Sequence, residues 1–261
     1  MRVICDSNIW YGFVDGTFDL SVIEKHNLCT PIKAIEEIAT SENLINRPSY
    51  VKKVLSLALT APNQILLENP FDHILGLINS EHSPNVEQSE FIFNEVVKFI
   101  SLEDDYLNSK TDDPTFAEMV KQWDKGIEAS AQSVNNMLPI IRQNIKNGKG
   151  KNAHRQLKTE ILVKELIANM SEQVIEQHEL DINLDWSEFP WNKIQMLITT
   201  WDIYFKDLEL SGTMKFHKND WIDILNLFYV QPGSRYWTNE QKWLRIFERS
   251  ENIQNYVFES Y

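Results

Sequence analysis

The sequence predicts a three-layer α/β/α fold with a central parallel sheet and a large helical insertion. In the first seventy residues, short apolar strands alternate with helical segments. Residues 71–210 carry apolar side chains at helical spacing almost throughout, and the alternation returns after Gly212. Alternating strands and helices are typical of parallel sheets covered by helices. We therefore expect a discontinuous domain of residues 1–70 and 212–261, and an inserted helical subdomain of residues 71–211.

The N-terminal segment is predicted to read β-α-β-α-α-β. Thr30 is expected to cap the helix after the second strand, with Pro31 at its first position, because Pro tolerates that position and Thr accepts backbone N–H bonds. The apolar residues that follow recur three and four positions apart. The predicted elements are a strand at 1–5, a helical segment from 9–14, a short amphipathic helix before residue 27, a strand at 27–29, a helix from 30, a helix at 49–59 and a strand at 64–67.

The C-terminal segment is predicted to contain one more strand between two helices. A strongly apolar helix begins at Asn219 or Asp220 and runs to Tyr229, and Pro232-Gly233 then breaks the chain. Residues 235–238 form the expected strand. Asn239 or Glu240 begins the last predicted helix.

Composition limits the class of protein. The chain has 261 residues, 43% of them hydrophobic, and a formal net charge of −13. This acidic balance disfavours free-standing, high-affinity nucleic-acid binding, although a local basic patch could still bind nucleic acid. Two cysteines cannot form a disulfide framework in a chain of this length. No apolar run reaches the ~18 residues that a membrane helix needs, and the N-terminus lacks a signal-sequence pattern, so we expect a cytoplasmic protein.

Carboxylates stand at the predicted strand ends and helix starts. Asp6 follows the first strand, and Glu37 lies on the helix after the second. Asp220 and Asp223 lie one turn apart on the helix after residue 212, and Glu240 follows the last strand. Ligands of parallel α/β sheets bind at the carboxyl ends of the strands, and clustered carboxylates are stable mainly around a hard divalent cation. The pattern predicts a Mg²⁺ or Mn²⁺ site that activates water against a phosphodiester.

These motifs resemble the PIN-domain nuclease family. Asp6-Ser7-Asn8 after an apolar strand looks like the opening of that family, and residues 30–38, with an acid before an aliphatic residue, look like its second motif. Asn219 to Asp223 resembles the third motif, and residues 236–243 resemble the fourth, a Thr-x-Asp followed by an aromatic. Glu240 stands where Asp is usual, and the long helical insertion also departs from compact members of the family.

The resemblance implies a metal-dependent endoribonuclease that acts on single-stranded RNA, with DNA as an alternative substrate. Asp6 and Asp220 would be the principal metal ligands, Glu37 and Asp223 would complete the site, and Glu240 would bind or orient a second ion. Asn8 and Thr238 would orient the carboxylates. A homodimer or an inhibitory partner protein would fit the family as well.

Other interpretations stay open. Asp6 and Asp220 could be ordinary N-cap residues, and Glu37 and Glu240 could be solvated helix charges. The fold could also serve as a catalytically inactive protein-interaction module. A haloacid-dehalogenase-type phosphohydrolase is disfavoured, because it needs Asp-x-Asp and Asn8 stands at the third place.

One segment of this acidic chain is locally basic. Residues 142–158 contain six Lys or Arg and no acid, which could supply salt-sensitive phosphate contacts. A solvated loop is the alternative. The candidate phosphate-binding residues are Arg142, Lys146, Lys149, Lys151, Arg155 and Lys158.

Three tryptophans, Trp186, Trp191 and Trp201, could stack on bases, but core packing is favoured.

Overall fold

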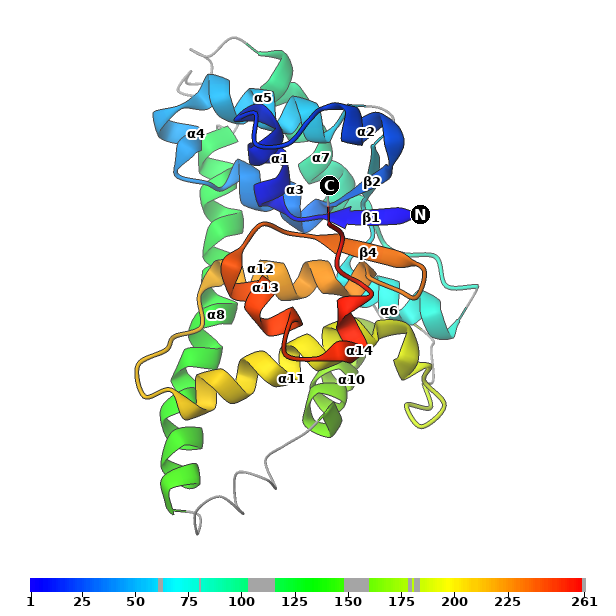
Figure 1. The fold of residues 1–261 in the computed structure, drawn as a ribbon, viewed down its shortest axis with the longest axis vertical. Helices are drawn as coiled ribbons and strands as arrows, with labels where there is room; N and C mark the ends of the chain where they lie inside the picture. The colour runs from blue at the N-terminus through cyan, green and yellow to red at the C-terminus, as the bar shows by residue number, and fades with distance from the viewer. Residues whose placement is uncertain are drawn as a thin grey trace.

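The computed structural model describes residues 1–60, 63–79, 81–102, 116–147, 160–177, 180 and 184–259. Its described part is an α/β fold in which helices lie above and below a small sheet (Figure 1). The prediction of an α/β fold with a parallel sheet is therefore confirmed. Among the described helices, none combines the length and the apolar character that a membrane span requires.

The sheet has four parallel strands in the order β3-β2-β1-β4. In β1, Val3 and Cys5 face one apolar core and Ile4 faces the other, because successive strand residues point to opposite faces. A strand buried on both faces reads as a continuous apolar run, which is what residues 3–5 show. The strands are β1 (Arg2–Cys5), β2 (Asn27–Pro31), β3 (Gln64–Leu66) and β4 (Ser234–Trp237).

The first core lies under helices of the N-terminal third of the chain. Trp10 and Phe13 of α1 are buried there, and Phe13 meets Trp237 of β4 edge-on with ring centroids 5.5 Å apart. The first and last segments of the chain therefore share this core. Its helices are α1 (Ser7–Val14), α2 (Ser21–Lys25), α3 (Ile32–Ala39), α4 (Asn43–Asn46), α5 (Pro48–Ala58) and α7 (Glu87–Ser101).

The second core joins the middle of the chain to its C-terminal segment. Trp201 and Tyr204 of α11 are buried in this core together with Ile4 of the sheet and Trp243 of α13. The prediction that Trp201 packs in the core is confirmed, and Trp186 and Trp191 pack partly buried against the same core. Its elements are α6 (Pro70–Ile78), α10 (Glu160–Gln177), η2 (Trp191–Ile194), α11 (Gln195–Leu210), α12 (Lys218–Asn226), η3 (Leu227–Tyr229), α13 (Gln241–Phe247) and α14 (Glu251–Gln254).

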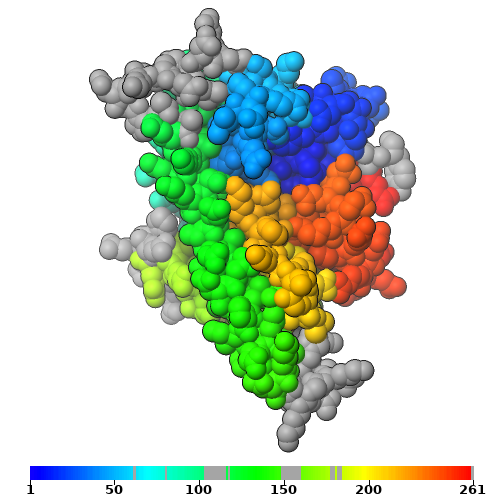
Figure 2. All heavy atoms as spheres, turned by 90° about the vertical axis from the view of Figure 1, so that its left-hand side faces the viewer, coloured from blue at the N-terminus to red at the C-terminus, as the bar shows by residue number. Residues whose placement is uncertain are grey.

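One long helix, α8 (Phe116–Asn147), runs along the side of the molecule. Figure 2 shows it crossing most of the height of that face, beside the segment that leads into α12. It packs against α3, α11 and α12. The same helix therefore borders both the N-terminal helices and the C-terminal ones.

The starts of three predicted helices differ from the structure. The prediction of Thr30 as N-cap and Pro31 as first helical residue is wrong: β2 continues to Pro31, which is itself the N-cap of α3. Thr30 and Pro31 pair with Ile65 and Leu66 of β3, and this long-range pairing overrides the local helix signal. In the C-terminal segment, α12 begins at Lys218 and α13 at Gln241, each within one or two residues of the prediction.

Candidate metal centre

Asp6 lies at the carboxyl end of β1 and is 1% exposed. Its backbone N–H donates to the carbonyl of Trp237 at 3.0 Å, so the ends of β1 and β4 are joined at this point. One carboxylate oxygen, Oδ1, accepts the backbone N–H of Ser7 at 2.8 Å, which caps α1. The interpretation of Asp6 as an N-cap is thus confirmed. The cap uses one oxygen and leaves Oδ2 for other partners.

The predicted orienting residues both bind Asp6. Thr238 donates its hydroxyl to Asp6 Oδ2 at 2.7 Å, and Asn8 donates its amide to the same oxygen at 2.5 Å. Asn8 Oδ1 in turn accepts the backbone N–H of Asn239 at 2.9 Å. These bonds fix the carboxylate between the start of α1 and the segment that follows β4.

Two further acids meet Asp6. Glu37 comes from α3 and Asp223 from α12, and each of the three residues offers a carboxylate oxygen within 4.8 Å of the others. Asp223 is 1% exposed, and its Oδ2 accepts the indole N–H of Trp243 at 2.7 Å. Its other oxygen, Oδ1, and Glu37 Oε2 are buried without a hydrogen-bond partner. We name Asp6, Glu37 and Asp223 the acid cluster.

The electrostatics of the acid cluster are unfavourable without a cation. Burial raises the pKa of Asp6 to about 6, and the charge of Glu240 adds to the rise. Burial and the neighbouring charge of Asp6 raise the pKa of Glu37 to about 8. Burial and the charges of Asp6 and Glu37 likewise raise the pKa of Asp223 well above its ordinary value. Desolvation and like charges both disfavour ionised carboxylates, and an oxygen-seeking divalent cation would remove both penalties.

Asp220 is not a member of the acid cluster. Its Oδ2 accepts the backbone N–H of His217 at 2.8 Å in a capping box and also binds the hydroxyl of Tyr204. Its Oδ1 is paired with the ammonium of Lys242. The N-cap of α12 is therefore His217 rather than Asp220, which stands at the third helical position and takes part in capping through its side chain. The structure brings Asp6 together with Asp223, one turn further along α12, rather than with Asp220, because these three donors hold the Asp220 carboxylate at the start of the helix.

Among the described residues, Lys242 forms an ion pair with a member of the acid cluster, and the sequence did not lead us to predict it. Besides its pair with Asp220, its Nζ lies 3.7 Å from Asp223 Oδ2 and 3.8 Å from Glu240 Oε2. Burial alone lowers the pKa of Lys242, but the charges of Asp220 and Asp223 outweigh this and hold it above its ordinary value. A signal existed: a buried group of acids requires a cation, and Lys242 follows Glu240 by two residues.

Glu240 lies at the rim of the site. It occupies the N-cap position of α13, and its side chain is 37% exposed. It lines a cleft of about 580 Å³ together with Lys242, Asp220 and the residues Gln132 and Asn135 of α8. The residues of the acid cluster do not line this cleft, but Lys242, which does, has its Nζ 3.7 Å from Asp223 Oδ2.

The basic segment is described only in part. Arg142 donates from its guanidinium to the carbonyls of Leu208, at 2.7 Å, and Met214, at 2.6 Å, so it ties α8 to the end of α11 and to the loop that follows. Lys146 is exposed near the end of α8. The other candidate phosphate-binding residues, Lys149, Lys151, Arg155 and Lys158, lie outside the described residues.

Comparisons with protein-family models, with curated proteins and with solved structures found no match to this chain. The geometry and chemistry of the site therefore carry the functional argument.

Proposed function

We propose that this chain is a nuclease that uses Mg²⁺ or Mn²⁺ to hydrolyse phosphodiester bonds, as an endoribonuclease on single-stranded RNA. The observation that carries the proposal is the acid cluster: three carboxylates, far apart in the sequence, converge at the carboxyl end of a parallel sheet. Ligands of this class of fold bind at that edge. The choice of RNA rests on the resemblance of the four acidic motifs to PIN-domain nucleases.

The acid cluster fits a hard divalent cation. All its potential ligands are carboxylate oxygens, which Mg²⁺ and Mn²⁺ prefer. Asp223 Oδ1 and Glu37 Oε2 are buried without a partner, a costly arrangement for any polar atom and more so for a charged one. A cation bound by Asp6, Glu37 and Asp223 would supply an activated water and stabilise negative charge on the phosphate oxygens.

The chain's own residues would hold these ligands in place. Thr238 and Asn8 fix the Asp6 carboxylate by hydrogen bonds, and Trp243 fixes that of Asp223. Residues that orient metal ligands in this way commonly change metal affinity or activity by about 10- to 100-fold when they are removed. Lys242 places a positive charge between the cleft and the acids, where it would meet an anionic phosphate.

The test is cleavage of end-labelled single-stranded RNA and single-stranded DNA by the purified chain in Mg²⁺, Mn²⁺ or EDTA. We expect RNA cleavage that requires a divalent cation and is lost in Asp6→Asn. Glu36→Gln is the matched control, because Glu36 is a buried acid of α3 that does not join the acid cluster. Cleavage by Asp6→Asn at the parental rate, or no metal-dependent cleavage of either substrate, would refute the proposal.

A second candidate function is a catalytically inactive interaction module, and Lys242 is the observation that favours it. Its ammonium already lies close to Asp223 and Glu240 and pairs with Asp220, so it neutralises part of the acidic charge without a metal. If this candidate is correct, Mn²⁺ will not raise the thermal stability of the parent chain. If the nuclease proposal is correct, Mn²⁺ will raise it in the parent and not in Asp6→Asn.

A further inference from the structure

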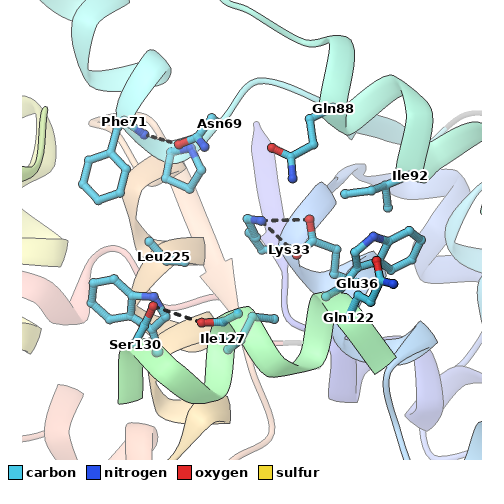
Figure 3. Close-up of a pocket in the computed structure, with 14 residues that line it drawn as sticks. Lys33, Glu36, Asn69, Phe71, Gln88, Ile92, Gln122, Ile127, Ser130 and Leu225 are labelled. Carbon is cyan, nitrogen blue, oxygen red and sulfur yellow. Dashed lines mark hydrogen bonds and ion pairs between the residues drawn. The ribbon is translucent and has the colours of Figure 1, made fainter. Parts of the chain in front are cut away.

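A second concave site is lined in part by α3 and α12 but shares no residue with the acid cluster. It is a pocket of about 380 Å³, within the range of small-molecule sites. Figure 3 shows Gln88 and Ile92 of α7 on one side of this pocket and Ile127 and Ser130 of α8 on the other. Together with residues of α3, α12 and the start of α6, they enclose a space that the acid cluster does not share.

The walls of the pocket combine aromatic and apolar surface. Ile92, Leu225 and Phe71 are buried at its base. Trp123 and Trp221 are half-buried and also line it. Indole rings beside buried apolar side chains suit a flat, weakly hydrated ligand. Stacking of a planar ring on an aromatic side chain contributes favourably to its binding free energy.

Three of the residues that line the pocket, Asn69, Gln88 and Gln122, carry side-chain amides. Gln88 and Gln122 form no hydrogen bond with any described residue. Asn69 accepts the backbone N–H of Phe71 with its Oδ1 at 2.9 Å, and its amide N–H groups donate to none of the described residues. An amide offers a donor and an acceptor side by side, which is the pattern that Asn and Gln use to recognise the edge of a base.

The charge of the pocket disfavours an anion. Lys33 is the cationic residue among its described lining residues, and its Nζ is bound by both carboxylate oxygens of Glu36 at 2.8 Å. Because this pair is neutral overall, a phosphate or carboxylate would gain little from Lys33 and would face Glu36. The pocket therefore suits an uncharged ligand that carries hydrogen-bonding groups.

Gly126 marks a position from which a side chain could fill the pocket. It lies in the interior of α8 and lines the pocket, and a Cβ built on it would have no heavy atom within 4 Å. Glycine weakens a helix interior relative to alanine, and no packing contact requires it here. A larger residue at this position would project into open space and reduce the room for a ligand.

We propose that this pocket binds a nucleobase, presented as a nucleoside. The base would pack against the indole surface, and its edge would bond to the amides of Gln88, Gln122 or Asn69. Flat aromatic contact together with amide hydrogen bonds to the base edge is how proteins read a base held out of a stack. The proposal does not depend on the nuclease assignment, because it uses none of the residues of the acid cluster.

The experiment is calorimetric titration of the full chain with adenosine, guanosine, cytidine and uridine, with adenosine monophosphate and inorganic phosphate as anionic probes. We expect saturable binding of at least one nucleoside, no binding of inorganic phosphate, and unchanged binding in Asp6→Asn. Gly126→Leu should abolish binding by filling the pocket. Gly76→Leu is the matched control, because Gly76 lies in an exposed part of α6 where an added Cβ also meets nothing within 4 Å.

A second variant keeps the test decisive if Gly126→Leu does not fold. Gln88 and Gln122 are exposed and have no partners among the described residues, so the double variant Gln88→Ala/Gln122→Ala should fold as the parent does. It should bind the nucleoside about tenfold more weakly or worse, since it loses two hydrogen-bonding groups. No nucleoside binding, binding that requires the phosphate group, or parental affinity in a folded Gly126→Leu would overturn the proposal.

Discussion

Two adjacent glutamates of α3 have opposite surroundings. Glu36 is 3% exposed and lines the pocket of Figure 3, where Lys33 satisfies both of its oxygens. Glu37 points toward Asp6 and Asp223, and its Oε2 is buried without a partner. Burial of a carboxylate therefore does not by itself mark a reactive site. The difference lies in whether the fold supplies a counter-charge.

The same contrast separates the two aspartates of α12. Asp220 has three hydrogen-bonding or ionic partners, namely Tyr204, His217 and Lys242. Asp223 keeps one oxygen without a partner and shares the acid cluster. The carboxylate of Asp220 is engaged by an ammonium and by the helix cap, whereas Asp223 keeps an oxygen that could bind a cation.

We expect the largest effect when substitutions of the two aspartates, Asp223 and Asp220, are compared. Asp223→Asn should slow metal-dependent RNA cleavage by about 10³-fold, since removal of a metal ligand costs roughly 4 kcal/mol of transition-state stabilisation. Asp220→Asn should instead weaken the pair with Lys242 and lower the free energy of unfolding by roughly 2 kcal/mol. Single-turnover cleavage and urea unfolding measure the two effects. Loss of cleavage in Asp220→Asn alone, with normal stability, would reverse the assignment.

The next largest effect is expected on Mn²⁺ affinity when substitutions of Glu37 and Glu36 are compared. Glu37→Gln should weaken Mn²⁺ binding by about 100-fold, because it replaces an anionic ligand with a neutral one. Glu36→Gln should change the affinity for Mn²⁺ by no more than about twofold, because Glu36 is paired with Lys33 and does not belong to the acid cluster. Titration followed by the electron paramagnetic resonance of free Mn²⁺ gives both affinities. Equal losses in the two variants would show that the contrast between the glutamates is not functional.

The fold and three of the site's acids could be predicted because their signals are local. Strand β1 is a continuous apolar run that ends at Asp6, and Glu37 and Asp223 lie on helices with clear apolar periodicity. In a parallel sheet the strand ends share one edge, so position along the chain is enough to bring such residues near each other. The prediction of a metal at this edge stays a prediction.

The remaining features depend on contacts that local sequence does not encode. Asp220 and Asp223 share one helix face, and Tyr204 of the preceding helix is among the groups that decide which of them is saturated. The start of α3 also depends on a long-range contact, because Thr30 pairs with β3 and the helix begins only after Pro31. The contacts of Lys242 with Asp220 and Asp223 likewise depend on how α13 packs against α12.

Metal affinity should also depend on pH. The pKa of Glu37, raised by burial and by Asp6 to about 8, means that this carboxyl is protonated at neutral pH without metal. A cation must displace that proton, so affinity for Mn²⁺ should rise by about tenfold or more per pH unit from pH 6 to 8 and level off above. Glu37→Gln should flatten this slope. A pH-independent affinity in the parent would contradict the electrostatic account.

Stability in EDTA should show the opposite trend. The pKa of Glu37 is raised from 4.5 to about 8 in the folded chain, so the folded state holds a proton that the unfolded state has lost. Stability from this group is fully present below pH 4.5 and is lost as pH rises to about 8. The melting temperature in EDTA should therefore fall across this window, and Mn²⁺ should restore it at pH 8.

The smallest expected effect concerns the pocket side of α3 and α12. Gly126→Ala should raise the free energy of unfolding by about 0.5–1 kcal/mol, because alanine favours a helix interior and its methyl group meets no atom there. Gly76→Ala in α6 should stabilise the chain by a similar amount, since that position is also helical and open. Urea unfolding measures both changes.

The two variants should differ in ligand binding alone. The methyl group at residue 126 narrows the pocket and should weaken nucleoside binding, whereas the one at residue 76 should not. If Gly126→Ala destabilises the chain, α8 needs the glycine for its own conformation.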